Sequence, residues 1–210
     1  MTAMSGPLLW DVDTQVDFIR SDGKLPVPEA EEAIPAMARL VRWAEAEGVT
    51  HLATADDHEL TDPEIADAAD FETTFPPHCL RGTPGAAKIP ETAQRDPLPL
   101  SLTPDPPSVL PDLVRDRREL LLLKKSFSAF SNPNLEPLLD LLKPDEVILF
   151  GVATDVCDHA AIMGLLERQY SVAFVEDASR GLEPDFVAHS FELWRAGGVR
   201  FTTTDEVVGS

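Results

Sequence analysis

Six short apolar runs are spaced along this chain of 210 residues, and they constrain its fold more than any other feature of the sequence. Runs of this length, apolar on both faces, are typical of strands buried inside a parallel sheet. No run approaches the roughly 20 residues that a membrane-spanning helix needs. The runs lie at residues 8–12, 51–55, 119–124, 146–152, 171–175 and, more weakly, 199–202.

Helical patterns fill most of the intervals between these runs. Apolar side chains recur at helical spacing over residues 29–47, and Gly48 follows them as a common helix end. Similar patterns cover residues 134–142, 155–168 and 184–196. Because strand and helix alternate, the sequence predicts an α/β fold with a doubly wound, mostly parallel sheet and right-handed crossovers.

Residues 61–111 interrupt this alternation, since they are rich in Pro, Asp, Glu and Thr and have weak periodicity. A stretch of this kind is either a set of functional loops or a linker between two domains. Neither flank holds enough strands for a sheet of its own. We therefore expect a single domain over residues 1–210, with an irregular loop region at about residues 56–111.

The composition is strongly acidic, because 37 Asp and Glu against 17 Lys and Arg give a formal net charge of −20. Such a chain repels phosphate backbones, so we expect no nucleic-acid partner. The N-terminus lacks the basic segment and apolar segment of a signal peptide, and we expect a cytoplasmic protein without membrane association. The partners that remain are a small-molecule substrate and further copies of the chain in a homo-oligomer.

Two cysteines, Cys79 and Cys157, are too few for a disulfide framework and favour at least one thiol with a chemical role. Cys157 follows a predicted strand and falls in the first turn of a predicted helix. Backbone N–H groups and the helix dipole would lower its pKa there, and the same N–H groups could hold an oxyanion. A buried, inert cysteine is the alternative, but the strand-to-helix position favours a nucleophile.

Acidic residues cluster where the first predicted strand ends, at Asp11, Asp13 and Asp17. They would share one face while the chain stays extended. Sites in open α/β sheets form at the carboxyl ends of strands, so one of these carboxylates could act as a general base. A turn bearing solvated acids explains the pattern at least equally well.

A pair of lysines, Lys124 and Lys125, follows the leucine-rich run at residues 120–123. A lysine at the inner end of such a strand needs a carboxylate partner, and Asp13 is a candidate. Periodicity does not choose between the two lysines. Alternatively, both mark the point where the strand enters water.

Candidate metal ligands lie in the loop region. The sequence Asp56-Asp57-His58 presents a carboxylate and an imidazole on one side of an extended segment, and His78 follows later. One carboxylate and two imidazoles suit Zn²⁺, Fe²⁺ or Mn²⁺. The alternative is a pair of loop histidines with hydrogen-bonding roles. Cys79 could join a metal site, but its neighbours in the sequence indicate packing.

These segments, in this order, resemble those of the isochorismatase-like cysteine hydrolases, and within them the nicotinamidases. The likeness extends over roughly residues 8–181. The stretch Pro-Pro-His-Cys followed by Gly-Thr-Pro-Gly is similar to the nicotinamidases in particular. The matching segments are Asp13-Thr14-Gln15-Val16-Asp17-Phe18, Asp56-Asp57-His58, Phe75-Pro76-Pro77-His78-Cys79, Gly82-Thr83-Pro84-Gly85, Lys124 with Phe127-Ser128-Ala129-Phe130, and residues 151–157.

The resemblance implies a catalytic triad of Asp13, Lys124 and Cys157. It selects Lys124 over Lys125 because the family lysine lies four residues before the serine of the Ser-Ala-Phe segment. It also implies a cis peptide bond between Val152 and Ala153, which would turn the N–H of Ala153 towards the oxyanion, beside that of Cys157.

The resemblance further implies one divalent metal ion, zinc foremost, bound by Asp56, His58 and His78 in the loop region. It places the substrate pocket near Phe18 and Phe75. Two departures from the family concern this region. Many members have Trp where Phe75 stands, and some have a further histidine where residues 59–66 hold none.

The activity that the resemblance implies is hydrolysis of nicotinamide to nicotinate and ammonia through a thioester, a reaction of NAD salvage. The alternatives are a related amidase with a ureido or maleamate-type substrate, and an inactive binding module of the same fold. An isochorismatase proper acts on a vinyl ether without a metal, so it would leave Asp56, His58 and His78 unexplained.

Overall fold

A seven-stranded parallel sheet forms the centre of the computed structural model, which describes residues 6–71, 73–106 and 108–209. Its strand order is β3-β4-β2-β1-β5-β6-β7, and every neighbouring pair is parallel. The predicted α/β class is thereby confirmed. The strands are β1 (Leu8–Val12), β2 (Thr50–Asp56), β3 (Leu98–Leu100), β4 (Glu119–Lys124), β5 (Val147–Gly151), β6 (Val172–Val175) and β7 (Arg200–Thr202).

Helices connect most of these strands. The predicted ones are present as α2 (Ala30–Glu47), α4 (Leu135–Leu142), α5 (Cys157–Glu167) and α6 (Pro184–Ala196). Gly48 ends α2 with a left-handed φ of 67°, as its sequence pattern predicts. Among the described residues, no helix is long and apolar enough to cross a membrane. The sequence pattern misses the shorter helices α1 (Val16–Ile19), α3 (Leu110–Val114) and α7 (Thr204–Val208), because so few residues show no periodicity.

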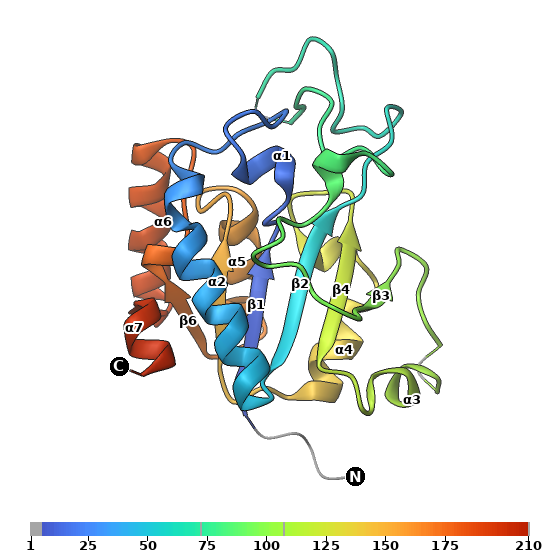
Figure 1. Cartoon of the computed structure of the whole chain (residues 1–210), viewed down its shortest axis with the longest axis vertical. Helices are drawn as coiled ribbons and strands as arrows, with labels where there is room; N and C mark the ends of the chain where they lie inside the picture. Colours follow the sequence, from blue (N-terminus) through green and yellow to red (C-terminus); the bar gives the residue numbers. More distant parts are fainter. Residues whose placement is uncertain (1–5, 72, 107, 210) are drawn as a thin grey trace.

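The two faces of the sheet are covered by different helices (Figure 1). Side chains of β1 alternate between them, so that Leu9 packs in one apolar cluster with Met37 of α2. Trp10 points to the other face and packs in a second cluster with Leu138 of α4 and Leu165 of α5. Both clusters consist of buried side chains, which explains why the strand runs are apolar on both faces.

One strand, β3, lies inside the stretch that the sequence shows as irregular. It contributes only three residues to the edge of the sheet beside β4. Its central residue is Pro99, which a strand tolerates at the edge but not at the centre of a sheet. Strands from before and after the stretch therefore belong to one sheet, and residues 61–111 do not link two separate sheets.

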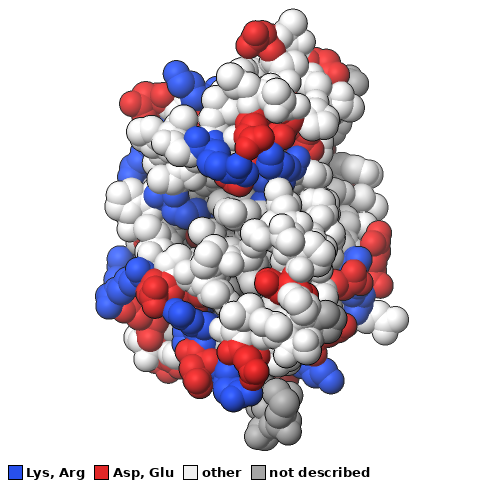
Figure 2. Space-filling view, turned by 90° about the vertical axis from the view of Figure 1, so that its right-hand side faces the viewer, with Lys and Arg blue, Asp and Glu red and all other residues white. Residues whose placement is uncertain are grey.

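Charged side chains are dispersed over the face of the molecule shown in Figure 2. Lysine and arginine side chains alternate there with aspartate and glutamate around a broad area of uncharged residues. The acidic excess of the chain is therefore not gathered into a single patch on that face.

The carboxyl ends of β1, β2, β4 and β5 lie together at one edge of the sheet. In the strand register Asp56 opposes Lys124, and Val12 opposes Gly151. The loops between β2 and β3, coloured teal to green in Figure 1, extend over this edge. Side chains that are distant in the sequence are thereby brought to a common site.

Candidate active site

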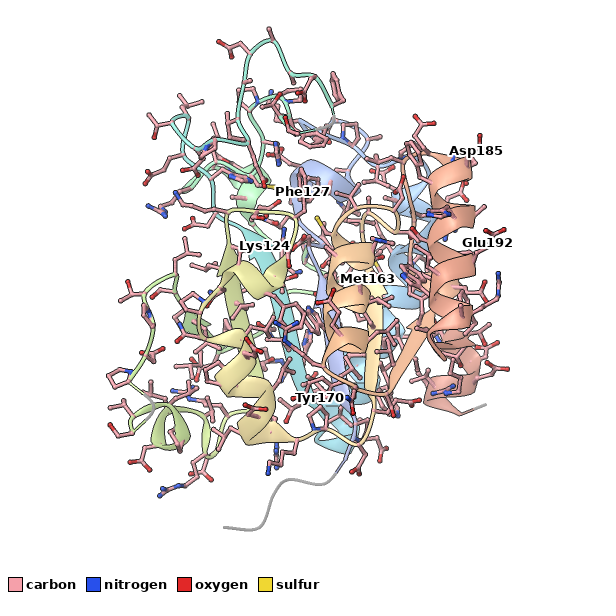
Figure 3. All side chains as sticks on the ribbon, turned by 180° about the vertical axis from the view of Figure 1, so that it is seen from behind. Lys124, Phe127, Met163, Tyr170, Asp185 and Glu192 are labelled. Atoms are coloured by element: carbon pink, nitrogen blue, oxygen red, sulfur yellow. The ribbon has the colours of Figure 1, made fainter. Side chains whose placement is uncertain are left out.

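Lys124 ends β4 and is almost completely buried, with 1% of its surface exposed. Figure 3 shows it at the end of the strand, with Phe127 farther out among the loops. Its Nζ lies 2.6 Å from Asp56 Oδ1, 2.9 Å from Asp13 Oδ2 and 3.6 Å from Cys157 Sγ. Burial opposes the charge of this lysine, but the two carboxylates outweigh burial and raise its pKa well above the ordinary value.

Lys125 points away from this cluster. Its Nζ lies 2.8 Å from Asp62 Oδ1, and its side chain is partly exposed. The strand alternation that leaves Lys124 inside therefore places Lys125 outside. The choice that periodicity leaves open is thus resolved by the register of β4 against β2.

Asp13 follows β1 directly and adopts a left-handed φ of 50°. The turn directs its carboxylate towards Lys124, and Oδ1 accepts a hydrogen bond of 2.8 Å from Thr54 Oγ1. Burial raises the pKa of Asp13 above its ordinary value, the Lys124 charge opposes that rise, and the Asp56 charge adds to it. The carboxyl group therefore has more proton affinity than a solvated aspartate, as a general base needs.

Asp11 within β1 and the acids that follow this strand do not share one face, contrary to the expectation from an extended chain. The left-handed turn at Asp13 and the helix α1 separate them. Asp11 Oδ1 lies 3.0 Å from Lys88 Nζ, whereas Asp17 Oδ2 accepts the N–H of Cys79 at 2.7 Å. Each carboxylate thus has its own partner.

Cys157 is the first residue of α5, in agreement with the predicted helix start. The predicted lowering of its pKa is wrong. Burial of the thiol, opposed by Lys124 but reinforced by Asp13 and Asp56, raises the pKa well above its ordinary value. The Asp13 carboxylate therefore favours the protonated form of the thiol.

The segment between β5 and α5 brings backbone close to the sulfur. The peptide bond between Val152 and Ala153 is cis. The carbonyl oxygen of Ala153 accepts the N–H groups of Val156 and Asp158, at 3.0 and 3.1 Å, which closes the turn into the helix. Ala153 and Cys157 line the same pocket.

Asp56, His58 and His78 come together as the sequence predicts. One ligand atom from each lies within 4.8 Å of the others, and all three side chains are buried. The Nε2 atoms of His58 and His78 lie 3.7 and 3.9 Å from Asp56 Oδ2. Nε2 of His58 is buried without a hydrogen-bond partner. A cation held among these atoms would satisfy it, so the residues fit a divalent metal ion.

The two histidines differ in their other ring nitrogen. His78 Nδ1 lies 2.7 Å from the carbonyl oxygen of Pro76, so it donates its proton there and leaves Nε2 for a metal. Burial lowers the pKa of His78. For His58 burial also acts against protonation, but the Asp56 carboxylate outweighs it and raises the pKa.

Asp56 belongs to both groups, which the sequence does not predict. Its Oδ1 contacts Lys124, and its Oδ2 faces the two histidines. Burial acts to raise the pKa of this carboxyl, but the Lys124 charge and His58 lower it far below the ordinary value. The side chain is therefore ionised and joins the lysine cluster to the candidate metal ligands.

An apolar pocket opens above Cys157, and Phe18 and Phe75 line it as predicted. Phe127 and Glu64 also line it, and the sequence prediction lacks both. The ring of Phe127 meets that of Phe75 edge-on at 5.4 Å, and its place in the Phe-Ser-Ala-Phe segment was the available signal. Burial raises the pKa of Glu64. No local pattern marks Glu64, which lies in a loop without periodicity.

Known proteins are similar to this chain over most of its length. The isochorismatase domain family matches residues 8–206. The nicotinamidase of Escherichia coli (strain K12) is 27% identical over 215 residues, which cover 92% of this chain and 93% of that one. The nicotinamidase/pyrazinamidase of Mycobacterium tuberculosis (strain ATCC 25618 / H37Rv) is 27% identical over 200 residues, covering 90% and 94%. The structure of Pyrococcus horikoshii pyrazinamidase in complex with zinc superposes with a TM-score of 0.71 at 24% identity, covering 94% and 98%.

Proposed function

This chain belongs to the isochorismatase family, and from that membership we propose that it is a cysteine amidohydrolase that converts nicotinamide to nicotinate and ammonia. The full-length similarity to nicotinamidases supports this substrate. One geometric observation carries the proposal. A single buried ammonium, that of Lys124, contacts the carboxylate of Asp13 and lies 3.6 Å from the sulfur of Cys157.

The proton of the Cys157 thiol moves first in the proposed reaction. Asp13 accepts it, and the sulfur attacks the carbonyl carbon of the amide. The C–S bond forms as the carbonyl electrons move to oxygen. When the C–N bond breaks, Asp13 returns the proton to the nitrogen, which leaves as ammonia. Water then attacks the thioester with Asp13 as the base, and the products are nicotinate and the regenerated thiol.

Lys124 serves this sequence through its charge. A neighbouring cation favours the ionised form of Asp13 before attack and keeps the carboxylate directed at the thiol. The raised pKa of Cys157 is consistent with this order of events, because a protonated thiol needs an adjacent base. The N–H groups of Ala153 and Cys157 would hold the oxyanion as the negative charge develops.

Asp56, His58 and His78 would hold the metal, for which their nitrogen and oxygen donors suit Zn²⁺, with Fe²⁺ or Mn²⁺ as alternatives. When bound, the metal would orient the ring nitrogen of the substrate, directly or through water. The chain itself directs the two Nε2 atoms and Asp56 Oδ2 at a common point beside the pocket.

The pocket favours a neutral aromatic amide over the anionic alternatives. Three phenylalanines, Phe18, Phe75 and Phe127, offer ring faces and edges to a planar substrate. Among the described lining residues there is no lysine or arginine, whereas Glu64 and Asp56 are acidic. A ureido or maleamate-type substrate would bring its own carboxylate next to them, where no lysine or arginine among the described lining residues could pair with it.

Ammonia release from nicotinamide by the purified protein tests the proposal. We expect turnover that falls on treatment with a chelator and recovers when Zn²⁺ is restored. Maleamate, assayed in parallel, should react far more slowly. Turnover of maleamate in preference to nicotinamide would reverse the substrate assignment, and no release from either amide would contradict the amidohydrolase.

A further inference from the structure

Asp17 connects α1 to the loop that contains His78. Its side chain is buried, with 5% of its surface exposed. One carboxylate oxygen accepts the N–H of Cys79 at 2.7 Å, and the other accepts the N–H of Lys24 at 3.1 Å. The first of these donors belongs to the peptide unit that directly follows His78, so Asp17 fixes the plane of that unit.

The backbone of Cys79 needs such support. Its φ of 44° lies in the left-handed region, which is unfavourable for a residue with a side chain. Its carbonyl oxygen accepts the N–H of His58 at 3.2 Å, and the carbonyl oxygen of His58 accepts the N–H of Arg81 at 2.9 Å. Cys79 is thus held on its nitrogen side by Asp17 and on its oxygen side by one of the candidate ligands.

The loop that contains Gly85 packs closely against the Asp17 carboxylate. A Cβ atom added at Gly85 would lie 2.2 Å from both carboxylate oxygens, so only a glycine lets the loop approach so closely. The next residue, Phe18, places its ring 5.3 Å from the ring of His78. Helix α1 therefore contacts His78 in two ways. Asp17 binds the peptide unit that follows the histidine, and Phe18 packs against the imidazole ring.

Gln15 shows that the same segment holds another candidate ligand in a similar way. Its side-chain oxygen accepts the N–H of Asp56 at 2.8 Å, and its side-chain nitrogen donates to the carbonyl oxygen of Asp56 at 2.8 Å. Alternate polar residues after β1 thus reach different parts of the site. Asp13 contacts the lysine, Gln15 the backbone of Asp56 and Asp17 the backbone beside His78.

We propose that Asp17 is a positioning residue that sets the metal affinity of the site by fixing the orientation of His78. The inference rests on the proposed function only in taking Asp56, His58 and His78 as the metal ligands. Partners that orient a ligand commonly change metal affinity roughly 10- to 100-fold when they are removed. Asp17 accepts its hydrogen bonds from the backbone of Cys79 and Lys24, so its effect should be on metal binding and not on the reactivity of Cys157.

A double-mutant cycle on metal affinity tests this proposal. Zn²⁺ affinity is measured by competition with a chromophoric chelator, and Co²⁺ is followed by its visible absorption. Asp17→Asn should weaken Zn²⁺ binding about 10- to 100-fold and alter the Co²⁺ spectrum. In a His78→Ala background the same substitution should change affinity less than about threefold, because the group through which it acts is missing.

Asp11→Asn is the matched control, since Asp11 is also a buried carboxylate that binds a loop residue, Lys88, but contacts no candidate ligand. It should leave Zn²⁺ affinity unchanged. The rate at which iodoacetamide alkylates Cys157 should be the same in Asp17→Asn as in the unsubstituted protein. If Asp17→Asn unfolds, Gly85→Ala keeps the charge and displaces the carboxylate, and it should weaken Zn²⁺ binding in the same way.

Unchanged Zn²⁺ affinity in folded Asp17→Asn or Gly85→Ala would overturn the inference. So would an equal loss with and without His78, since the effect would then be a general loosening of the loop. Failure of the unsubstituted protein to bind Zn²⁺ is a different result, because it would contradict the metal site of the proposed function itself.

Discussion

Two lysine–carboxylate pairs, each with a buried aspartate, begin from nearby residues of the chain, and they differ in how their charge is balanced. Asp11 pairs with Lys88, whose Nζ also donates to the carbonyl oxygen of Thr54 at 3.0 Å. Asp13 must share its lysine, Lys124, with a second carboxylate. The first pair joins β1 to a loop, and the second faces a thiol and a pocket.

The difference is visible in the proton affinities of the two aspartates. Both are fully buried, which acts to raise the pKa of each. At Asp11 the Lys88 charge, together with His51, outweighs burial and lowers the pKa, whereas at Asp13 the shared lysine does not, and the pKa is raised. The neighbours of Asp11 thus favour its ionised form, whereas the shared cation leaves Asp13 with more affinity for a proton.

Removal of the thiol should have the largest effect, because the Asp13–Lys124 pair faces a thiol and the Asp11–Lys88 pair does not. We expect Cys157→Ala to lower amide hydrolysis by several orders of magnitude while the fold is retained, as loss of a covalent nucleophile does. Cys79→Ser should keep most of the activity. The measurement is ammonia release, with circular dichroism as the check on folding. Turnover by a folded Cys157→Ala protein would exclude the thioester route.

Substitution of each lysine in turn compares the two ion pairs directly. Lys124→Ala should lower kcat/KM about 10²- to 10⁴-fold, the usual contribution of a general base, because Asp13 and Asp56 then repel each other. Lys88→Met should instead lower the free energy of unfolding, by about 3–5 kcal/mol, since the buried Asp11 loses its lysine and keeps only Thr14 and His51 beside it.

Lys125→Ala is the control for these two lysine substitutions. Because Lys125 forms a partly exposed salt bridge with Asp62, its loss should change neither kcat/KM nor the free energy of unfolding by much. Activity assays and urea denaturation of all three variants give the comparison. Equal losses of activity in Lys124→Ala and Lys88→Met would mean that the shared cation has no special role.

Loss of a metal ligand should distinguish the role of the metal site from that of the triad. His78→Ala should weaken Zn²⁺ binding strongly and raise KM, because the site keeps only two of three ligands. Cys157 should still react with iodoacetamide at a similar rate, since Asp13 and Lys124 remain in place. Metal analysis and alkylation kinetics are measured on the same preparation. Full metal content in His78→Ala would remove this histidine from the ligand set.

Asp158 extends the comparison to a buried carboxyl group whose neighbouring charges are acidic. Burial first, and then Asp13, Asp155 and Asp11, raise its pKa well above the ordinary value, so the folded chain keeps it protonated. Unfolding releases that proton above the pKa of a solvated aspartate, about 3.9. The contribution of Asp158 to the free energy of unfolding is therefore fully present below that pH. It is lost as the pH rises towards the pKa of Asp158 in the folded protein.

Asp158→Asn should remove this pH dependence, which is the smallest of the expected effects. The variant should exceed the unsubstituted protein in free energy of unfolding, and by more at pH 8 than at pH 5. Urea denaturation at the two pH values measures the difference. A gain that does not grow with pH would show that Asp158 is ionised in the folded protein.

Local patterns were sufficient for every described strand except β3 and for the long helices, because apolar runs and helix starts are properties of neighbouring residues. The double role of Asp56 was not predictable in this way. It depends on β2 lying beside β4, which are separated by the irregular stretch. The same holds for Gln15 and Asp17, whose partners are backbone groups of distant loops.

The pKa of Cys157 shows a second limit of sequence reasoning. A helix start is readable from the sequence and acts to lower the pKa of a cysteine. Complete burial beside two carboxylates is not readable, and it has the larger effect. The short strand β3 was missed for a related reason, because only its position at the edge of the sheet makes Pro99 acceptable.

The order of strands in the sheet also determines when the site can exist during synthesis of the chain. β1 carries Asp13 at its end, but its partner on one side is β5, which precedes Cys157 and is made much later. Pairing between such distant segments is slow because a long loop must close first. A nascent chain that has only its first half therefore has the base without the nucleophile. We expect the reactive centre to appear only in the last stage of folding, when most of the polypeptide has been made.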